Sequence, residues 1–203
     1  MFQATTSAKP GLWCIVLAAG ASRRLGQPKQ LLRFRSKTLL RRALDVAASV
    51  SPLRTIVVIG AQAHRMRAHL QRTGTSARIV YNRHWAQGMG TSLRAGLKQL
   101  PPQARAALIL LTDQPEISPR TIRKLLNAHR ARPAFNIASM YENRLGVPAI
   151  LPRHNWQRLR ELDGDSGARD LLRDSAAAGR LISVPCPEAS WDIDTPDDLA
   201  QLR

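Results

Sequence analysis

Short, continuous apolar segments alternate with longer amphipathic segments along the chain. The apolar segments are bounded by turn residues, which is typical of buried strands in a parallel sheet. In the amphipathic segments, apolar residues recur at helical spacing on one face. The predicted strands are Leu12–Ala18, Thr55–Ile59, Ala77–Tyr81, Ala106–Leu111, Phe135–Met140, Val147–Leu151 and Leu181–Val184. The predicted helices are Thr38–Val50, Gln62–Gln71, Thr91–Leu100, Pro119–His129, Asn155–Glu161, Ala168–Ala177 and a short one that begins near Pro196.

This alternation predicts βα units arranged around a largely parallel sheet. Ser118 is placed to cap the helix that starts at Pro119. The chain of 203 residues suits one domain, because globular domains commonly contain roughly 100 to 200 residues. No internal repeat, low-complexity tract or linker interrupts the pattern. We therefore expect one α/β domain over residues 11–203, preceded by an N-terminal extension over residues 1–10.

Basic residues outnumber acidic residues, and the whole excess lies in the first half of the chain. Residues 1–112 contain 18 Lys and Arg and a single acid, Asp45, whereas residues 113–203 contain 13 basic and 13 acidic residues. The net charge of +17 favours an anionic partner: a nucleotide, a nucleic acid, a phosphorylated metabolite or an acidic protein. Because aromatic residues make up only 4% of the chain and no stacking motif is present, we expect no nucleic-acid partner.

Composition narrows the class of protein. With 44% apolar and 22% charged residues, the chain is neither disordered, collagen-like nor membrane-embedded. Two cysteines, Cys14 and Cys186, cannot form a disulfide framework, and no Cys/His cluster suggests zinc. The first eleven residues lack the apolar stretch of a signal peptide, and no later run is long enough to span a membrane. We expect a cytoplasmic protein without membrane contact.

The segment LAAGASRRLGQPKQLL, residues 17–32, follows the first predicted strand and has the composition of a phosphate-binding loop. Gly20 and its small neighbours let backbone amides approach an anion, and Arg23, Arg24 and Lys29 supply positive charge. The Walker A pattern GxxxxGK[ST] and the dinucleotide fingerprint GxGxxG are both absent. Taken alone, the segment is equally consistent with a turn that carries solvated arginines.

Two aspartates are candidate metal ligands. Asp113 follows a buried strand at the carboxyl end of the predicted sheet, where open α/β sheets bind ligands. Asp194 precedes the predicted start of the last helix. A Mg²⁺ ion in proteins takes one or two carboxylates together with phosphate oxygens and water. Considered singly, each aspartate is as readily a turn or cap residue, and Asp192 is the alternative second ligand.

Two further glycine-containing regions are candidate ligand sites. Gly88 and Gly90 precede a helix whose Thr91 or Ser92 caps it or touches a ligand, and a glycine backbone can approach a nucleobase closely. The segments GVPAI, residues 146–150, and LDGDSGARDLL, residues 162–172, either line an acceptor pocket or form a turn and a helix cap. The candidate acceptor-binding residues are Gly146, Pro148, Asp165 and Arg169.

Taken in this order, the segments resemble the molybdenum cofactor nucleotidyltransferase family, and within it the cytidylyltransferase branch. The opening signature LAAGxSxRMGxxKQLL is matched, with Leu25 where Met is usual, at Leu17, Ala18, Ala19, Gly20, Ser22, Arg24, Gly26, Lys29, Gln30, Leu31 and Leu32. Related guanylyltransferases open with LAGG and DK, so Ala19 and Pro28 favour cytidine over guanosine. GMGTSLRAGL, LLTDQP and DIDTPDDL are similar to the family's base-recognition loop, metal-binding turn and closing motif. The resemblance extends from Ile15 to Leu199.

This resemblance implies a single three-layer nucleotidyltransferase domain over residues 11–203, with a mostly parallel, Rossmann-like sheet. The implied reaction transfers CMP from CTP to the terminal phosphate of molybdopterin and releases pyrophosphate. Arg24 and Lys29 are the implied catalytic residues, and Asp113 and Asp194 the implied ligands of a Mg²⁺ cofactor. The implied nucleotide-binding residues are Leu17, Ala18, Ala19, Gly20, Ser22, Gly88, Gly90, Thr91 and Ser92. The implied partners are CTP, a phosphorylated pterin and a molybdoenzyme or its maturation chaperone.

Two alternatives stand beside this interpretation. One is a CTP- or GTP-dependent nucleotidyltransferase that acts on another phosphorylated small molecule. The other is a basic nucleic-acid-binding module, for which the net charge of +17 is the sole support. Release of pyrophosphate from CTP favours the first class, whereas a steeply salt-dependent shift of DNA favours the second.

Overall fold

The centre of the fold is a seven-stranded sheet with the strand order β5-β4-β1-β6-β8-β7-β9. The computed structural model describes residues 11–161 and 167–200. The strands are β1 (Leu12–Ala18), β4 (Thr55–Ile59), β5 (Arg78–Tyr81), β6 (Ala106–Leu111), β7 (Asn136–Tyr141), β8 (Arg144–Pro152) and β9 (Leu181–Pro185). Neighbouring strands are parallel except at β8, which runs antiparallel to β6 and β7. The alternation of segments thus correctly predicts a mostly parallel α/β sheet.

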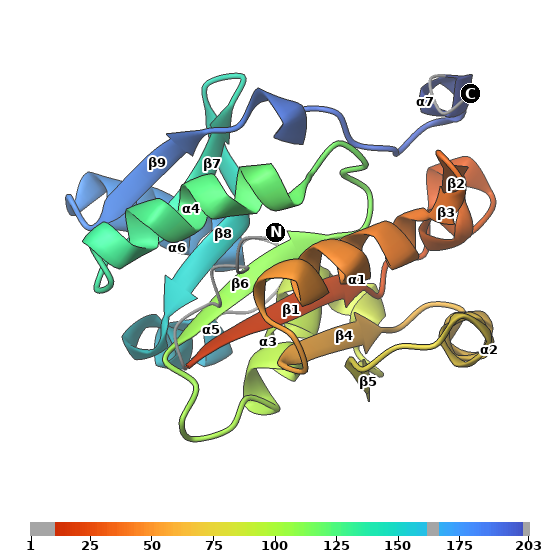
Figure 1. The fold of residues 1–203 in the computed structure, drawn as a ribbon, viewed down its shortest axis with the longest axis horizontal. Coiled ribbons are helices and arrows are strands. Elements are labelled where there is room, and N and C mark those ends of the chain that lie inside the picture. Colours follow the sequence, from red (N-terminus) through yellow and green to blue (C-terminus); the bar gives the residue numbers. More distant parts are fainter. Residues whose placement is uncertain (1–10, 162–166, 201–203) are drawn as a thin grey trace, which may run out of the picture.

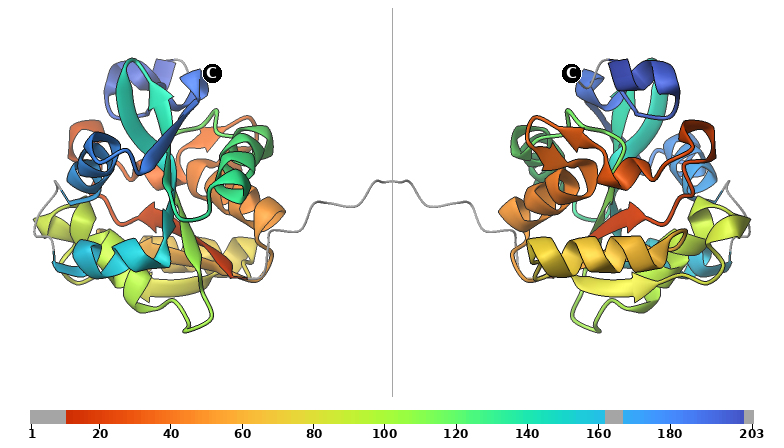
Figure 2. Two further views of the ribbon diagram at one scale, coloured as in Figure 1. Left: turned by 90° about the vertical axis from the view of Figure 1, so that its left-hand side faces the viewer. Right: turned by 90° about the vertical axis from the view of Figure 1, so that its right-hand side faces the viewer.

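Helices cover both faces of the sheet and complete three layers (Figures 1 and 2). On one face lie α1 (Leu39–Val50), α2 (Ala63–Thr73) and α4 (Pro119–Ala131). On the other lie α3 (Met89–Lys98), α5 (Trp156–Glu161) and α6 (Gly167–Ala177). Successive strand residues point to opposite faces, so Val16 joins one apolar core and Ile15 the other. The continuous apolar strands are explained by burial on both sides.

One helix begins earlier than the sequence predicts. α3 starts at Met89 rather than Thr91, because Gly88, with φ 110°, takes the position that precedes the helix. Thr91 and Ser92 therefore lie inside α3, both buried, and the expectation that one of them caps the helix is wrong. The cap predicted for α4 is confirmed, since the Ser118 side chain accepts a hydrogen bond from the Thr121 backbone N–H.

A small hairpin, β2 (Arg33–Phe34) and β3 (Lys37–Thr38), was not predicted. Each strand has two residues, too few for alternation of apolar and polar positions to show. The Phe34 ring meets the Trp191 ring edge-on, with centroids 5.4 Å apart. Together with Leu25, Leu39 and Ile193 these rings form a small separate core, which we call the clasp.

The clasp holds the end of the described chain against the first third of the sequence. α7 (Pro196–Ala200) follows it and lies beside the hairpin in Figure 1. The backbone N–H of Ile193 also donates to the Asp113 carbonyl at 2.9 Å. These contacts bring residues 191–195 to the carboxyl ends of β1 and β6.

Candidate active site

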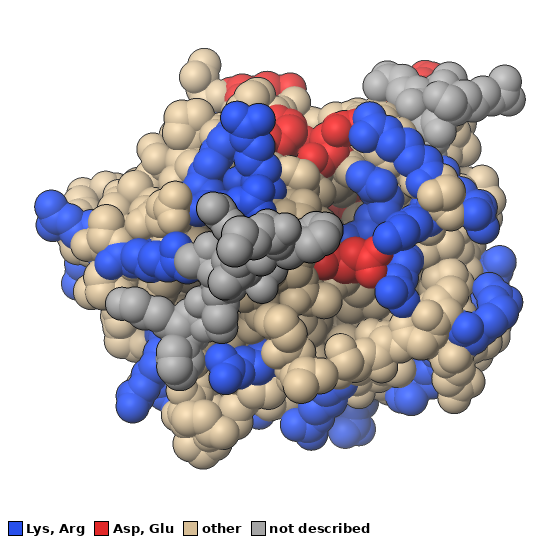
Figure 3. All heavy atoms as spheres, in the orientation of Figure 1, with Lys and Arg blue, Asp and Glu red and all other residues tan. Residues whose placement is uncertain are grey.

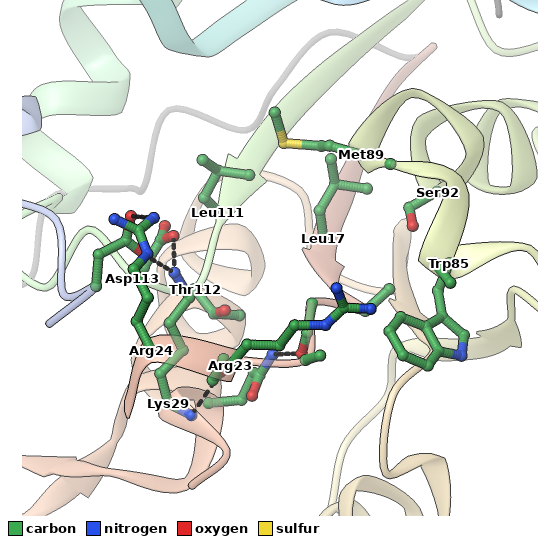
Figure 4. Close-up of a pocket in the computed structure, with 18 residues that line it drawn as sticks. Leu17, Arg23, Arg24, Lys29, Trp85, Met89, Ser92, Leu111, Thr112 and Asp113 are labelled. Atoms are coloured by element: carbon green, nitrogen blue, oxygen red, sulfur yellow. Dashed lines mark hydrogen bonds and ion pairs between the residues drawn. The ribbon is translucent and has the colours of Figure 1, made fainter. Parts of the chain in front are cut away.

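A cleft of about 460 Å³ opens at the carboxyl ends of β1 and β6 (Figure 4). Ligands bind at this edge in open α/β sheets. The predicted site residues in its wall are Leu17, Ala19, Gly20, Ser22, Arg24, Lys29, Gly88, Ser92, Asp113 and Asp194. Residues that the sequence analysis did not assign to a site also line it, namely Ala21, Gln30, Trp85, Ala86, Met89, Leu111 and Thr112. Arg23, which was expected to add charge to the loop, lines it too.

One end of the cleft is charged and is formed by Arg24, Lys29, Asp113 and Asp194. Lys29 Nζ donates to Asp113 Oδ2 at 2.7 Å and to Asp194 Oδ1 at 2.5 Å. Arg24 Nη2 donates to the other oxygen of Asp194, Oδ2, at 3.0 Å. Burial acts to lower the pKa of Lys29, but the two carboxylates outweigh it and raise that pKa above its usual value. Lys29 is therefore an ammonium ion at neutral pH.

Acidic groups at this end suit a hard divalent cation. Asp113 Oδ1 is buried and, in contrast to Oδ2, has no hydrogen-bond partner, so one of its oxygens is available as a ligand. The pKa of Asp192 is raised by burial and by the nearby charges of Asp113 and Asp194, which places it as a neighbour of the pair. Within residues 11–161 and 167–200, no three acidic, His or Cys side chains gather as a complete metal site. The residues fit Mg²⁺ or Mn²⁺ with substrate phosphate and water supplying the other ligands.

The loop that carries Lys29 is folded back on β1 by its own side chains. Ser22, in a left-handed conformation with φ 53°, accepts a hydrogen bond from the Lys29 backbone N–H at 3.0 Å. Buried Gln30 donates to the Gly20 carbonyl at 2.9 Å and to the Ala18 carbonyl at 3.4 Å. Ala18 itself lies beneath the loop, outside the cleft wall. These bonds explain why the Lys29 side chain points inward.

The other end of the cleft, which we call the neutral end, is walled by the uncharged side chains of Leu17, Trp85, Met89 and Ser92. In Figure 4 these side chains lie across the cleft from Arg24 and Asp113. The Arg23 guanidinium reaches across the neutral end towards Trp85 (Figure 4). Trp85 packs closely against the end of β4. A Cβ atom added at Gly60 would lie only 2.5 Å from the Cβ of Trp85. A glycine is therefore required at Gly60 for the ring to occupy this position.

A buried amide organises the neutral end. Asn82 Nδ2 donates to Thr91 Oγ1 at 2.8 Å and to Ser92 Oγ at 3.0 Å, and Asn82 Oδ1 accepts from the His84 backbone N–H. Thr91 points inward to this network, and neither it nor Gly90 lines the cleft. Because Ser92 Oγ accepts the amide proton, its own proton is free to be donated to a ligand.

The predicted acceptor-binding residues lie elsewhere or are not described. Pro148 is buried in β8, and its carbonyl accepts a hydrogen bond from Ser139 Oγ at 2.8 Å. Gly146 packs directly against the Tyr141 hydroxyl. Neither residue lines the cleft. Asp165 lies outside the described residues, and the side chain of Arg169 is likewise not described.

Basic side chains gather over the hairpin and the start of α1 (Figure 3). Arg33, Arg35 and Lys37 are exposed there. Arg35 pairs with Glu116, and Lys37 pairs with Asp45.

Among the helices that the structure describes, none has the length and apolar character of a membrane span.

The sequence and fold are similar to those of known proteins. Residues 14–180 match the MobA-like NTP transferase domain. The chain is 32% identical to nicotine blue oxidoreductase of Paenarthrobacter nicotinovorans, over 93% of this chain and 94% of that protein. The crystal structure of Rv0371c from Mycobacterium tuberculosis H37Rv has a TM-score of 0.76 and 32% identity, covering 94% of this chain and 96% of that one.

A second structure of Rv0371c, in complex with manganese, has a TM-score of 0.71 and 30% identity, covering 94% of this chain and 97% of the other. This manganese complex indicates that proteins of this family use a divalent metal. The match over residues 14–180 includes the phosphate-type loop, the neutral end and Asp113. The chain therefore belongs to the MobA-like NTP transferase family of nucleotidyltransferases.

Proposed function

We propose that this protein transfers CMP from CTP to the terminal phosphate of molybdopterin and releases pyrophosphate. The observation that carries the proposal is the meeting of Lys29, Asp113 and Asp194 at one end of a cleft whose other end is walled mainly by uncharged side chains. A nucleoside triphosphate has the same division, with anionic phosphates at one end and an uncharged base at the other. The resemblance of the opening loop to the cytidylyltransferase branch supports CTP as the nucleotide.

The chemistry follows from the charges of the reactants. An oxygen of the molybdopterin phosphate attacks the α-phosphorus of CTP, a new phosphorus–oxygen bond forms, and the bond to the β-phosphate bridge breaks. Because the attacking oxygen is already anionic, no general base is required. The protein contributes by positioning the reactants and by neutralising the charge that gathers on the phosphates. Arg24, Lys29 and the backbone amides of the loop after β1 would bind the β- and γ-phosphates.

Asp113 and Asp194 would hold the Mg²⁺ cofactor. A bound divalent cation withdraws negative charge from the phosphate oxygens it contacts. The unpartnered Asp113 Oδ1 and the neighbouring Asp194 carboxylate support this role. Asp192 remains the alternative second ligand, since its pKa is raised by burial and then by the nearby charges of Asp113 and Asp194.

The neutral end would hold the cytosine base. Ser92 has a proton to donate, and cytosine offers a ring nitrogen and a carbonyl oxygen as acceptors on one edge. Leu17, Ala19, Gly20 and Gly88 would complete this part of the nucleotide site. Three further residues of the nucleotide site would support it without lining the cleft, namely Ala18, Gly90 and Thr91.

The acceptor would be a phosphorylated pterin. Gly146, Pro148, Asp165 and Arg169 remain the proposed acceptor-binding residues. A molybdoenzyme or its maturation chaperone would receive the product, in the cytoplasm. The basic surface over the hairpin would favour the approach of such anionic partners.

Pyrophosphate release tests this proposal. Purified protein with Mg²⁺ and molybdopterin should release pyrophosphate from CTP, and should do so more slowly from GTP. Equal rates with both nucleotides would contradict the cytidine preference. Release with other phosphorylated small molecules and none with molybdopterin would favour the alternative nucleotidyltransferase.

The similarity to nicotine blue oxidoreductase supports a second candidate, an oxidoreductase. The same preparation can be tested, by absorbance, for oxidation of a reduced nicotinamide or flavin cofactor by an added organic dye that accepts the electrons. Cofactor oxidation with no pyrophosphate release under any nucleotide would replace the first proposal by the second. We expect the opposite result, because Arg24 and Lys29 meet the two aspartates at one end of the cleft, an arrangement suited to phosphates and a divalent cation.

A further inference from the structure

Lys29 is held between the two carboxylates that suit a divalent cation. Its ammonium nitrogen lies 2.7 Å from one oxygen of Asp113 and 2.5 Å from one oxygen of Asp194. The side chain is only 13% exposed, so little solvent screens these contacts. Arg24 also contacts Asp194, but its side chain is 71% exposed and its charge is well screened. Lys29 is therefore the main counter-ion of the pair.

An ion bound by both carboxylates would compete with this ammonium, because the unpartnered Asp113 Oδ1 belongs to the same carboxylate as the Oδ2 that Lys29 contacts. Mg²⁺ requires its oxygen ligands at about 2.0–2.1 Å, and it would then lie next to the lysine nitrogen. Two cations at such a separation in a partly buried site repel each other strongly. Metal binding to both aspartates thus requires the ammonium to leave.

The loop allows the ammonium to leave without moving the backbone. The Lys29 backbone N–H is anchored on Ser22, and neighbouring Gln30 is anchored on Gly20. The flexible lysine stem can therefore turn while its Cα stays in place. Phosphate oxygens of a nucleotide in the cleft would offer the ammonium new anionic partners.

We propose that Lys29 acts as an internal counter-ion, which closes the Asp113–Asp194 pair to divalent cations until a nucleoside triphosphate draws its ammonium away. The inference rests on the proposed nucleotidyl transfer site. It adds an order of events, in which the metal enters with or after the triphosphate. It also predicts that removing Lys29 strengthens the binding of metal alone, although Lys29 is a residue of the same site.

The experiment measures Mn²⁺ binding to the full chain without nucleotide, from the electron paramagnetic resonance signal of the free ion. Lys29→Met should bind Mn²⁺ at least about tenfold more tightly than the original protein, because the ion no longer meets a like charge at the two carboxylates. Lys37→Met is the matched control. It makes the same change on the exposed hairpin, where Lys37 pairs with Asp45 outside the cleft, and its Mn²⁺ affinity should be unchanged.

Two further arms locate the ion and guard against misfolding. Asp113→Asn added to Lys29→Met should remove the gain, and persistence of the gain would overturn the proposal. Mn²⁺ should raise the Tm of Lys29→Met by more than that of the original protein. Lys29→Gln provides the same comparison if the Met variant does not fold. Mn²⁺ affinity in the Lys29 variants that is equal to or weaker than in the original protein also overturns the counter-ion role.

The nucleotide arm separates this inference from the proposed function. A non-hydrolysable CTP analogue should strengthen Mn²⁺ binding to the original protein by a larger factor than to Lys29→Met. An equal factor in both proteins would overturn the release of Lys29 by the triphosphate. Absence of pyrophosphate release, together with the expected gain in the nucleotide-free titration, would instead reject the proposed transfer and leave the counter-ion role supported.

Discussion

The two ends of the cleft are built in different ways. At the charged end, Lys29, Asp113 and Asp194 come from three distant parts of the chain and contact one another directly. At the neutral end, Ser92 and its neighbours depend on one buried amide, Asn82, behind the cleft wall. A substitution at the charged end should remove a charged group and leave the fold intact. Loss of Asn82 behind the neutral end should instead remove buried hydrogen bonds on which the fold depends. Activity and stability should therefore respond differently at the two ends.

The largest effect is expected from the two aspartates. Asp113→Asn and Asp194→Asn should each nearly abolish Mg²⁺-dependent pyrophosphate release, while thermal unfolding hardly changes. The double variant should lose little more than either single one, because groups that act as a unit are not additive. If Asp194→Asn unfolds the protein or keeps its turnover, Asp194 is a cap and Asp192 becomes the candidate ligand.

Removal of the central cation should have the next largest effect. Lys29→Ala should lower the rate of pyrophosphate release by ~10²-fold, the size of effect seen when one charge-stabilising donor is lost. Steady-state kinetics with CTP provide the measurement, with Lys37→Ala as the exposed control. Unchanged turnover and unchanged CTP affinity would exclude Lys29 from the site.

At the neutral end, Asn82→Leu should destabilise the fold. The change leaves the polar groups of Thr91, Ser92 and His84 without their buried partner, at a cost of about 1–3 kcal/mol for a group left unsatisfied. Chemical denaturation measures this loss. Ser92→Ala keeps Asn82 and should instead raise the KM for CTP with little loss of stability. Equal effects of Asn82→Leu and Ser92→Ala on stability and on the KM for CTP would contradict a structural role for Asn82 and a binding role for Ser92.

The smallest effect concerns the surface around the charged end. Because the basic excess lies in residues 1–112, capture of anionic substrates should slow as ionic strength rises. A comparison of kcat/KM at low and physiological salt tests this, with kcat expected to change less. A kcat/KM that does not depend on salt would show that the charge asymmetry plays no part in substrate capture.

The sequence predicted the scaffold of the charged end well. β1 and β6 are continuous apolar segments, so their ends, and with them the loop before Lys29 and the turn at Asp113, could be placed at one edge of the sheet. The partnership with Asp194 came only from the family resemblance. Its physical basis, the bond from Ile193 to the Asp113 carbonyl and the clasp, is a tertiary contact that no local pattern reveals.

The neutral end was harder to predict. Asn82 and Trp85 occupy a loop without periodicity, and their positions depend on close packing across the sheet edge. A signal was present in Gly60 directly after β4, since a glycine at a strand end often marks a close approach. The sequence could not say that the approaching group is the Trp85 ring.

Asp194 stays in the site only while the clasp, a very small apolar core, remains packed. Leu25, Phe34, Leu39, Ile193 and Trp191 are separate from the two cores that hold the sheet together. Small units of this kind open at lower free energy than the whole fold. Opening of the clasp would withdraw one carboxylate from Lys29 while the seven strands stay paired. On heating, the charged end of the cleft should therefore come apart before the protein unfolds, and Trp191 fluorescence should report the first event.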